Sequence, residues 1–148
     1  MGDYFKTYIE PHNGELDEQI ISVISSHEEW YGKLEITDFL HSTMYDILDN
    51  DGNLVGFFGN SRWNNGGEPQ CVLCYAFVYP EYRGLGLFNK MVKYTIEHNN
   101  EAKTIVIGAM DNNELANTIY SRKFPISEHD DTDNSTWYMI KDRRAKNG

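Results

Sequence analysis

A strand-to-helix junction lies at Val78-Tyr79-Pro80-Glu81-Tyr82-Arg83-Gly84-Leu85-Gly86-Leu87-Phe88. Before it comes the continuous apolar run Cys71–Tyr79, which is typical of a strand covered on both faces. After it, apolar side chains recur at helical spacing through Thr95, and a second apolar run covers Lys103–Met110. The three segments predict a strand–helix–strand unit with a right-handed crossover.

Elements of both kinds extend outward from this unit. We expect further strands at Tyr4–Ile9, Met44–Leu48, Leu54–Trp63, Phe124–Ile126 and Thr136–Ile140, and helices at Leu16–Ile24, about 37–42 and Asn112–Lys123, the last with Leu115, Ala116 and Ile119 facing inward. Turns are predicted at 12–14, 49–53 and 64–69, where Gly, Asn, Asp and Pro concentrate. The order β-α-α-β-β-β-α-β-α-β-β predicts an α/β protein with a mixed sheet.

Size and charge restrict the function. The chain has 148 residues, which predicts a single domain over 1–148, and its net charge is -10. Nucleic-acid binders usually show a basic footprint, so we expect no nucleic-acid partner and favour a cationic one. The basic stretch 141–148 is expected to be a frayed tail.

Location and redox state follow from what the sequence lacks. It contains no stretch of about 20 apolar residues and no signal-peptide core, so we expect a cytoplasmic protein without membrane contact. Cys71 and Cys74 provide no disulfide framework, and no second ligand pair accompanies them, so we place both in the core and expect no metal site.

The segment Arg83–Phe88 has the properties of an anion site. Gly84 and Gly86 let the backbone approach a ligand closely, and the helix that follows adds unpaired N–H groups and the positive end of its dipole. Arg83 supplies a charged donor, and Lys90 and Lys93 follow within the same short segment. The alternative is a tight turn without a ligand. The segment is neither a P-loop nor a dinucleotide fingerprint.

The same segment resembles the acetyl-CoA loop of the GNAT N-acetyltransferase superfamily. Arg83, Gly86 and the preceding Val78-Tyr79-Pro80 match the family pattern, whereas Phe88 stands where Gly or Ala is usual. The resemblance implies a largely antiparallel twisted sheet of six to seven strands with about four helices, and acetyl-CoA as the acyl-donor co-substrate. It also implies cofactor contacts from Arg83, Gly84, Leu85, Gly86, Leu87 and Phe88.

A second family signature, Asn-x-x-Ala-x-x-x-Tyr, is matched by Asn113, Ala116 and Tyr120. The resemblance implies that Asn113 and Ala116 contact the cofactor arm, and that Tyr120 lies near the thioester sulfur and protonates the departing thiolate as a general acid. It further implies that backbone N–H groups near Phe77 and Val78 polarise the carbonyl. The alternative for Tyr120 is an ordinary half-buried helix tyrosine. The helix then reaches Phe124 without the Gly that the family usually has before it.

The general base and the acceptor are less defined. Glu28, Glu29, Glu35 and Asp111 are candidate bases, although each is also a typical surface carboxylate, and a water relay needs no base residue. The acidic loop 128–133 favours a cationic amine as the acceptor. It contains His129, and histidine is a residue type that can act as a general base.

These observations predict an N-acetyltransferase that moves an acetyl group from acetyl-CoA to a primary amine acceptor, such as a polyamine, an amino sugar or a protein amine. The rival hypothesis is a non-catalytic acyl-CoA-binding or interaction protein on the same fold, which Phe88 and the missing base favour. A third is a small α/β domain that binds another phosphate ligand. Exposed Trp30, Tyr31 and Trp63 permit a homodimer.

Overall fold

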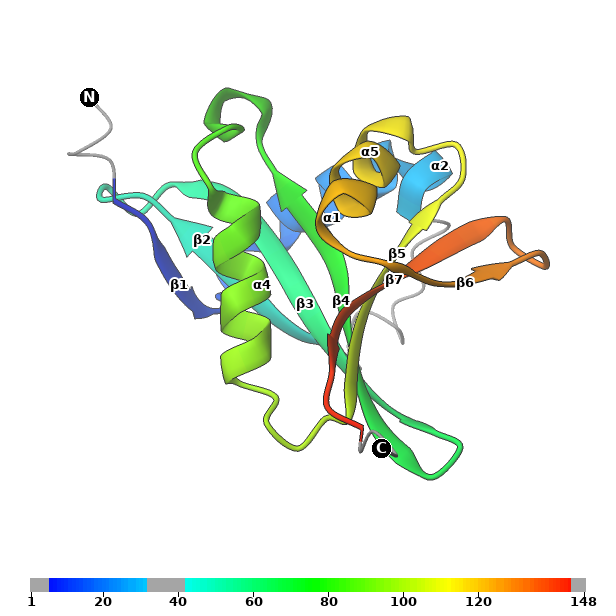
Figure 1. Ribbon diagram of the computed structural model, residues 1–148. Coiled ribbons are helices and arrows are strands. Elements are labelled where there is room, and N and C mark those ends of the chain that lie inside the picture. The colour runs from blue at the N-terminus through cyan, green and yellow to red at the C-terminus, as the bar shows by residue number, and fades with distance from the viewer. Residues whose placement is uncertain (1–5, 32–41, 145–148) are drawn as a thin grey trace.

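The computed structural model describes residues 6–31 and 42–144 of the chain (Figure 1). Its strands are β1 (Tyr8–Pro11), β2 (Thr43–Leu48), β3 (Leu54–Asn65), β4 (Glu68–Val78), β5 (Thr104–Met110), β6 (Ile126–Asp130) and β7 (Ser135–Asp142). Its α-helices are α1 (Asp17–Ser26), α2 (Glu28–Tyr31), α4 (Leu87–Glu97) and α5 (Glu114–Lys123), and short 3-10 turns lie at η2 (Gly14–Leu16) and η3 (Pro80–Tyr82).

The strands form one sheet in the order β1-β2-β3-β4-β5-β7-β6. Strands β4 and β5 are parallel, and the other neighbours in the described sheet are antiparallel. The crossover from β4 to β5 contains α4, as parallel neighbours require. The predicted mixed, largely antiparallel sheet is confirmed. Three helices of the described chain have ten or more residues, and α2 has only four. The described chain therefore has three long helices, one fewer than the roughly four helices expected.

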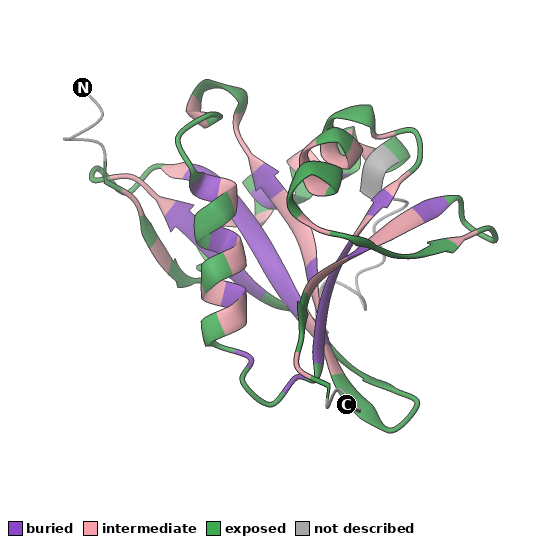
Figure 2. Ribbon diagram, viewed as in Figure 1, coloured by how far each residue is buried: buried purple, intermediate pink, exposed green. Residues whose placement is uncertain are grey.

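Helices cover both faces of the sheet, with α4 in front and α1 behind in Figure 1. Neighbouring residues of a strand therefore enter different cores. Tyr45 and Phe58 pack in the cluster that Leu87 and Met91 of α4 join. Met44 and Phe57 pack instead against Ile20 and Ile24 of α1. Most of β2 and β5 and the first half of β3 are consequently buried on both faces, as the purple ribbon of Figure 2 shows, whereas β4 is mostly intermediate.

Several boundaries differ from the predicted ones. The first strand reaches Pro11, whose ring a sheet tolerates at an edge strand, and residues 4 and 5 lie outside the described chain. The predicted helix near 37–42 falls mostly on residues 37–41, which also lie outside it. The turn predicted at 64–69 is shorter, because β3 continues to Asn65 and β4 begins at Glu68. The side chain of Leu115 is 51% exposed rather than inward.

The C-terminal stretch is more ordered than predicted. Lys141 and Asp142 belong to β7. The guanidinium of Arg143 donates hydrogen bonds to the carbonyl oxygens of Asn99 (2.7 Å), Ala102 (2.8 Å) and Ile96 (3.0 Å). These carbonyls end α4 and the loop after it, so a cation there satisfies acceptors that the helix leaves open. The expected frayed tail is therefore wrong for residues 141–143, and 145–148 lie outside the described chain.

Among the described residues, no helix has the length and apolarity that a membrane span requires. Trp63 is 61% exposed, as predicted, whereas the side chains of Trp30 and Tyr31 lie outside the description.

Candidate active site

The two parallel strands separate along their length. The register joins Gln70–Leu73 of β4 to Thr104–Ile107 of β5, and the remaining residues of β4 have registered partners only on β3. A cavity of about 600 Å³ opens where the strands part, and the first turn of α4 and the inner side of α5 complete its walls. The sheet thus exposes the edge of a central strand, which sheets otherwise keep paired.

A β-bulge lies in the unpaired part of β4. Phe57 is opposite Phe77 and Gly59 is opposite Cys74, so two residues of β4, Tyr75 and Ala76, face one residue of β3. Tyr75 has φ +51°, in the left-handed region. A Cβ on Gly56 of β3 would lie 2.7 Å from the carbonyl oxygen of Phe77, so glycine is required there for the two backbones to approach.

The ladder beyond the bulge decides which backbone groups face the cavity. The N–H of Tyr79 donates to the carbonyl of Val55 (3.0 Å), and antiparallel pairs alternate. Phe77 therefore directs its N–H toward β3, and Val78 directs its N–H and C=O away from β3. The Nε of Arg83 donates to that Val78 carbonyl (2.9 Å). Of the two predicted donors, the structure brings the N–H of Val78 to the cavity side and places that of Phe77 in the sheet.

The loop between β4 and α4 has the geometry predicted from its glycines. Gly84 and Gly86 have φ of +82° and +79°, backbone angles that residues with a side chain rarely adopt. Gly86 is the N-cap of α4. The first bond of the helix joins the N–H of Lys90 to the carbonyl of Gly86 (3.2 Å). The N–H groups of Leu87, Phe88 and Asn89 therefore have no acceptor within the helix, and they mark its positive end.

The cationic side chains that line the cavity are not all the ones predicted: of Arg83, Lys90 and Lys93, only Arg83 is among the lining residues. Arg83 lines the cavity with its guanidinium 5.6 Å from the centre of the Phe77 ring, and it pairs with no carboxylate in the described chain. Lys90 instead bonds to Thr7 (2.8 Å), and Lys93 lies 4.0 Å from Glu97. The second cation at the cavity is Lys123, which sequence reasoning missed. Its spacing of seven residues from Ala116 places it on the same helix face, and that signal could have found it.

Helix α5 brings the second signature to the opposite wall. Asn113 caps the helix, with its Oδ1 accepting from the N–H of Ala116 (3.1 Å). The predicted residues that line the cavity are Phe77, Val78, Arg83, Gly84, Gly86, Leu87, Phe88, Asn113, Ala116 and Tyr120. Leu85 is not among the lining residues, and its side chain is 48% exposed.

Tyr120 is held by other aromatic rings. Its ring stacks on Phe88, with centroids 5.3 Å apart, and meets the edge of Tyr138 at 5.7 Å. Desolvation raises the pKa of the Tyr120 phenol, and the charge of Tyr138 adds to the effect, so the group stays protonated at neutral pH. No side chain or backbone group in the described ranges hydrogen-bonds to the Tyr120 hydroxyl. Tyr120, a neutral donor without a hydrogen-bond partner in the described chain, therefore lines the cavity.

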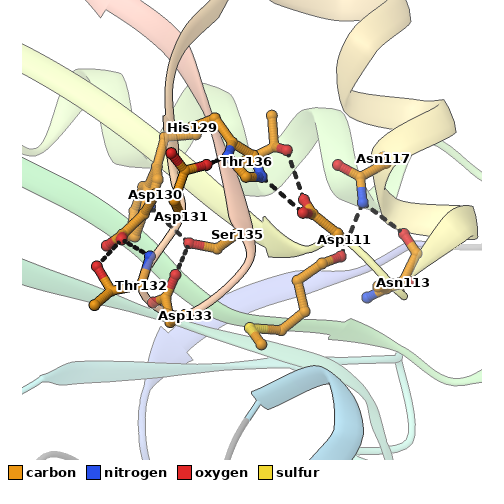
Figure 3. A network of polar contacts seen from close by, with 12 residues as sticks. Asp111, Asn113, Asn117, His129, Asp130, Asp131, Thr132, Asp133, Ser135 and Thr136 are labelled. Atoms are coloured by element: carbon orange, nitrogen blue, oxygen red, sulfur yellow. Dashed lines mark hydrogen bonds and ion pairs between the residues drawn. The ribbon is translucent and has the colours of Figure 1, made fainter.

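The predicted acidic loop is half strand, because β6 runs to Asp130. Its His129 lies between two carboxylates, with Nε2 2.7 Å from Asp111 and Nδ1 2.7 Å from Asp131 (Figure 3). Thr136 also donates to Asp111 (2.8 Å). The hydrogen bonds to Asp111 and Asp131 raise the pKa of His129, and the bond from His129 lowers that of Asp111. Both ring nitrogens thus face carboxylate oxygens, an arrangement that favours the protonated ring and does not suit a general base.

The candidate bases that the structure describes do not line the cavity. Neither Asp111 nor His129 lines it, Glu28 and Glu29 are exposed on α2, and Glu35 lies outside the described chain. Asp111 and His129 are nonetheless brought together from 18 residues apart. The described chain contains no group of three or more His, Cys, Asp and Glu side chains arranged to ligate a metal ion.

The two cysteines are thiols in protected positions. Burial raises the pKa of Cys71 to about 12 and that of Cys74 to about 11, and the thiol of Cys74 lies 3.6 Å from the Ser42 hydroxyl. Cys71 packs with Ala102 and Ile105 in a core cluster, as predicted for a structural residue.

The chain is similar in sequence to one family of known proteins and in fold to several solved structures. A family model described as "Acetyltransferase (GNAT) family" matches residues 6–124. Similar solved structures include a GNAT-family acetyltransferase of Staphylococcus aureus Mu50, with 21% identity, a TM-score of 0.67 and coverage of 92% of this chain and 100% of that one. Arabidopsis thaliana NAA60 in complex with a bisubstrate analogue has 13% identity, a TM-score of 0.70 and coverage of 90% and 97%.

The spermidine/spermine N-acetyltransferase SpeG of Vibrio cholerae has 14% identity, a TM-score of 0.64 and coverage of 90% and 91%. A search of curated proteins finds no match. The structural likenesses show the fold, and the family model covers most of the chain. The chain belongs to the GNAT acetyltransferase family.

Proposed function

We propose that the protein transfers an acetyl group from acetyl-CoA to a primary amine acceptor that carries positive charge, with Tyr120 as the general acid. Membership of the family makes the chain an acyltransferase that uses acetyl-CoA. One observation carries the proposed mechanism: Tyr120, whose hydroxyl has no hydrogen-bond partner among the described residues, lines the same cavity as the first turn of α4 with its open N–H groups.

The residues present fit the co-substrate. A pyrophosphate needs hydrogen-bond donors and positive potential, and the first turn of α4 with Arg83 supplies both. A flexible apolar arm needs an apolar channel, and the cavity is lined by Leu73, Ala76, Ile107, Ala116 and Ile119.

The chemistry follows from two donors on one cavity. Acetyl-CoA supplies a thioester; a C–N bond to the amine forms and the C–S bond breaks. The Val78 N–H is the proposed donor to the carbonyl oxygen, which gains charge during attack. The Tyr120 hydroxyl supplies the proton that the departing sulfur takes, the amine releases its own proton to solvent, and the Tyr120 phenolate regains a proton from solvent before the next turnover. A phenol whose pKa is raised by burial remains in the form that this role requires.

Negative charge near the end of β5 supports a cationic acceptor. The β6–β7 hairpin that carries His129 also carries Glu128, Asp130, Asp131 and Asp133. Asp131 and Asp111 contact His129 directly (Figure 3). A single histidine cannot neutralise this group of carboxylates, so the surface attracts a cation. Polyamines, amino sugars and lysine-bearing peptides share the required feature, an amine accompanied by positive charge.

The test is the release of free thiol from acetyl-CoA with and without an amine. We expect release to depend on the amine, and to be faster with spermidine than with a monoamine of similar amine pKa. The monoamine is the matched control, because it lacks only the second charge. Binding of CoA without release under any amine would support a non-catalytic acyl-CoA-binding protein. Failure to bind CoA at all would contradict the proposed site.

A homodimer and a cytoplasmic location stay proposals. The exposed Trp63 is the described residue that supports self-association, and the mass of the protein in solution tests it.

A further inference from the structure

Phe88 departs from the family pattern, and the structure shows where its bulk goes. It is the second residue of α4, next to Leu87, which is buried in the core. Its ring extends toward α5 and stacks on Tyr120, with centroids 5.3 Å apart and planes 20° apart. It also meets Phe124 edge-on, at 6.5 Å and 63°. The residue therefore spans the distance between the two helices that form the cavity.

Ring packing orients Tyr120, because hydrogen bonding does not. The Tyr120 hydroxyl has no hydrogen-bond partner among the residues described, so no polar contact directs it. One face of its ring lies on Phe88, and Tyr138 meets it edge-on at 5.7 Å and 78°. Tyr138 is itself fixed, since it is 3% exposed and its hydroxyl donates to Asn117 (2.7 Å). Phe88 thus supplies one of the two aromatic contacts that Tyr120 makes within the described chain, and it is the stacked one.

A second contact joins the same two turns. The Nζ of Lys123, in the last turn of α5, donates to the Oδ1 of Asn89 (2.9 Å), which follows Phe88 in the first turn of α4. The turn that presents open N–H groups and the turn that carries Tyr120 are therefore connected by an aromatic stack and a hydrogen bond. A shift in either turn reaches the other.

We propose that Phe88 is a positioning residue, whose stack on Tyr120 holds the phenol toward the cavity and links its orientation to the anion-binding turn of α4. The inference rests on the proposed function, in which Tyr120 is the general acid. Alanine at position 88 would leave one face of the Tyr120 ring without a neighbour, so the phenol would sample directions from which it cannot reach the reacting sulfur.

The experiment measures kcat for amine-dependent thiol release, and the dissociation constant of CoA, in Phe88→Ala and Phe88→Tyr. Each variant is made with Tyr120 intact and in the Tyr120→Phe background. We expect Phe88→Ala to lower kcat about tenfold while the CoA constant changes less than about threefold, because misplacement of a catalytic group affects chemistry more than binding. Phe88→Tyr keeps the ring and should restore kcat to within about twofold. In the Tyr120→Phe background, neither variant should lower kcat further.

Tyr94→Ala is the matched control. Tyr94 lies on the same helix and packs against Tyr45 and Phe58, and in the described chain its ring makes no aromatic contact with Tyr120, so the variant loses similar aromatic contacts and leaves the Phe88–Tyr120 stack in place. Its kcat should be unchanged. An equal loss of kcat from Phe88→Ala in both backgrounds, or an equal loss in Tyr94→Ala, would show a merely structural role and overturn the inference.

A measurement independent of activity separates this inference from the proposed function. In protein with 13C-labelled tyrosine, the Tyr120 signal is the one that Tyr120→Phe removes. We expect Phe88→Ala to lower its titration midpoint toward that of an exposed tyrosine, since water then reaches the ring. An unchanged midpoint with an unchanged kcat overturns the stack as a positioning device, whereas a native protein that releases no thiol overturns the proposed function alone.

Discussion

The two halves of β4 have the same strand backbone and opposite roles. Gln70–Leu73 pair with β3 on one side and β5 on the other, and Cys71 and Leu73 are buried there. Tyr75–Val78 begin with a bulge and keep only β3 as a neighbour. The paired half holds the sheet together, and the unpaired half directs the N–H of Val78 toward the cavity, where we propose that it meets the ligand. The comparison teaches that the site is located by the point at which strand pairing stops, rather than by any one side chain.

The largest expected effect concerns the cavity beside the unpaired half, on the wall that α5 forms. Tyr120→Phe removes the hydroxyl and keeps the ring, so we expect amine-dependent thiol release to fall by about 10²–10⁴-fold, the usual contribution of a general acid. Binding of CoA, measured by calorimetry, should change little. A variant that retains full activity would show that the departing sulfur obtains its proton elsewhere.

The paired half should respond in stability. Ile105 of β5 lies opposite Cys71 and is fully buried, so Ile105→Ala leaves a cavity and lowers the free energy of unfolding by about 2–5 kcal/mol. Urea denaturation monitored by circular dichroism measures the loss. At low temperature, where the variant remains folded, its affinity for CoA should equal that of the native protein. A change in affinity without a loss of stability would contradict the division of β4 into two roles.

A smaller effect is expected at the loop that follows the unpaired half. Gly86→Glu places a negative charge beside the open N–H groups of α4 at a residue with φ +79°, so we expect CoA to bind about tenfold more weakly or worse. Gly66→Glu is the matched control, since Gly66 also has a positive φ (+60°) and open space around it but lies in the β3–β4 turn. Equal binding by both variants would remove the phosphate site from this loop.

The smallest effect distinguishes the two thiols of β4. Cys71 lies in the paired half, and Cys74 lies where the pairing with β5 has ended. The thiolate is the reactive form, and burial raises the pKa of Cys71 to about 12 and that of Cys74 to about 11. Both should therefore react slowly with iodoacetamide at pH 8, and the rate should rise with pH as the thiolate fraction grows. Cys74, beside the bulge, should react before Cys71, as peptide mass analysis would show. Reaction of Cys71 first would mean that the paired half opens more readily.

The elements around the cavity were predictable because their signals are local. The apolar run of β4, the glycines at 84 and 86 and the helical spacing of α5 each lie within about ten residues, and these features were placed correctly. Glycines within β3 were a local signal that sequence reasoning did not use. Gly56 and Gly59 lie opposite the bulged segment of β4, and a glycine inside a strand often marks such a close approach.

Other features depend on residues far apart in the chain. Asp111 meets His129, and Arg143 reaches the carbonyl of Ile96, 47 residues away. The direction of Phe88 is of the same kind, because its partners Tyr120 and Phe124 belong to another helix. Such contacts follow from strand register and from how helices lie on the sheet, and no short sequence pattern encodes them.

The amino-acid sequence alone determined the strand–loop–helix that presents backbone donors and the helix that carries Tyr120, since backbone conformation and side-chain spacing are short-range properties. The tertiary structure alone decided that β4 and β5 part, that Val78 rather than Phe77 directs its N–H to the opening, and that Phe88 covers one face of Tyr120. The reason is that each of these depends on pairing and packing between segments that meet only when the whole chain has folded.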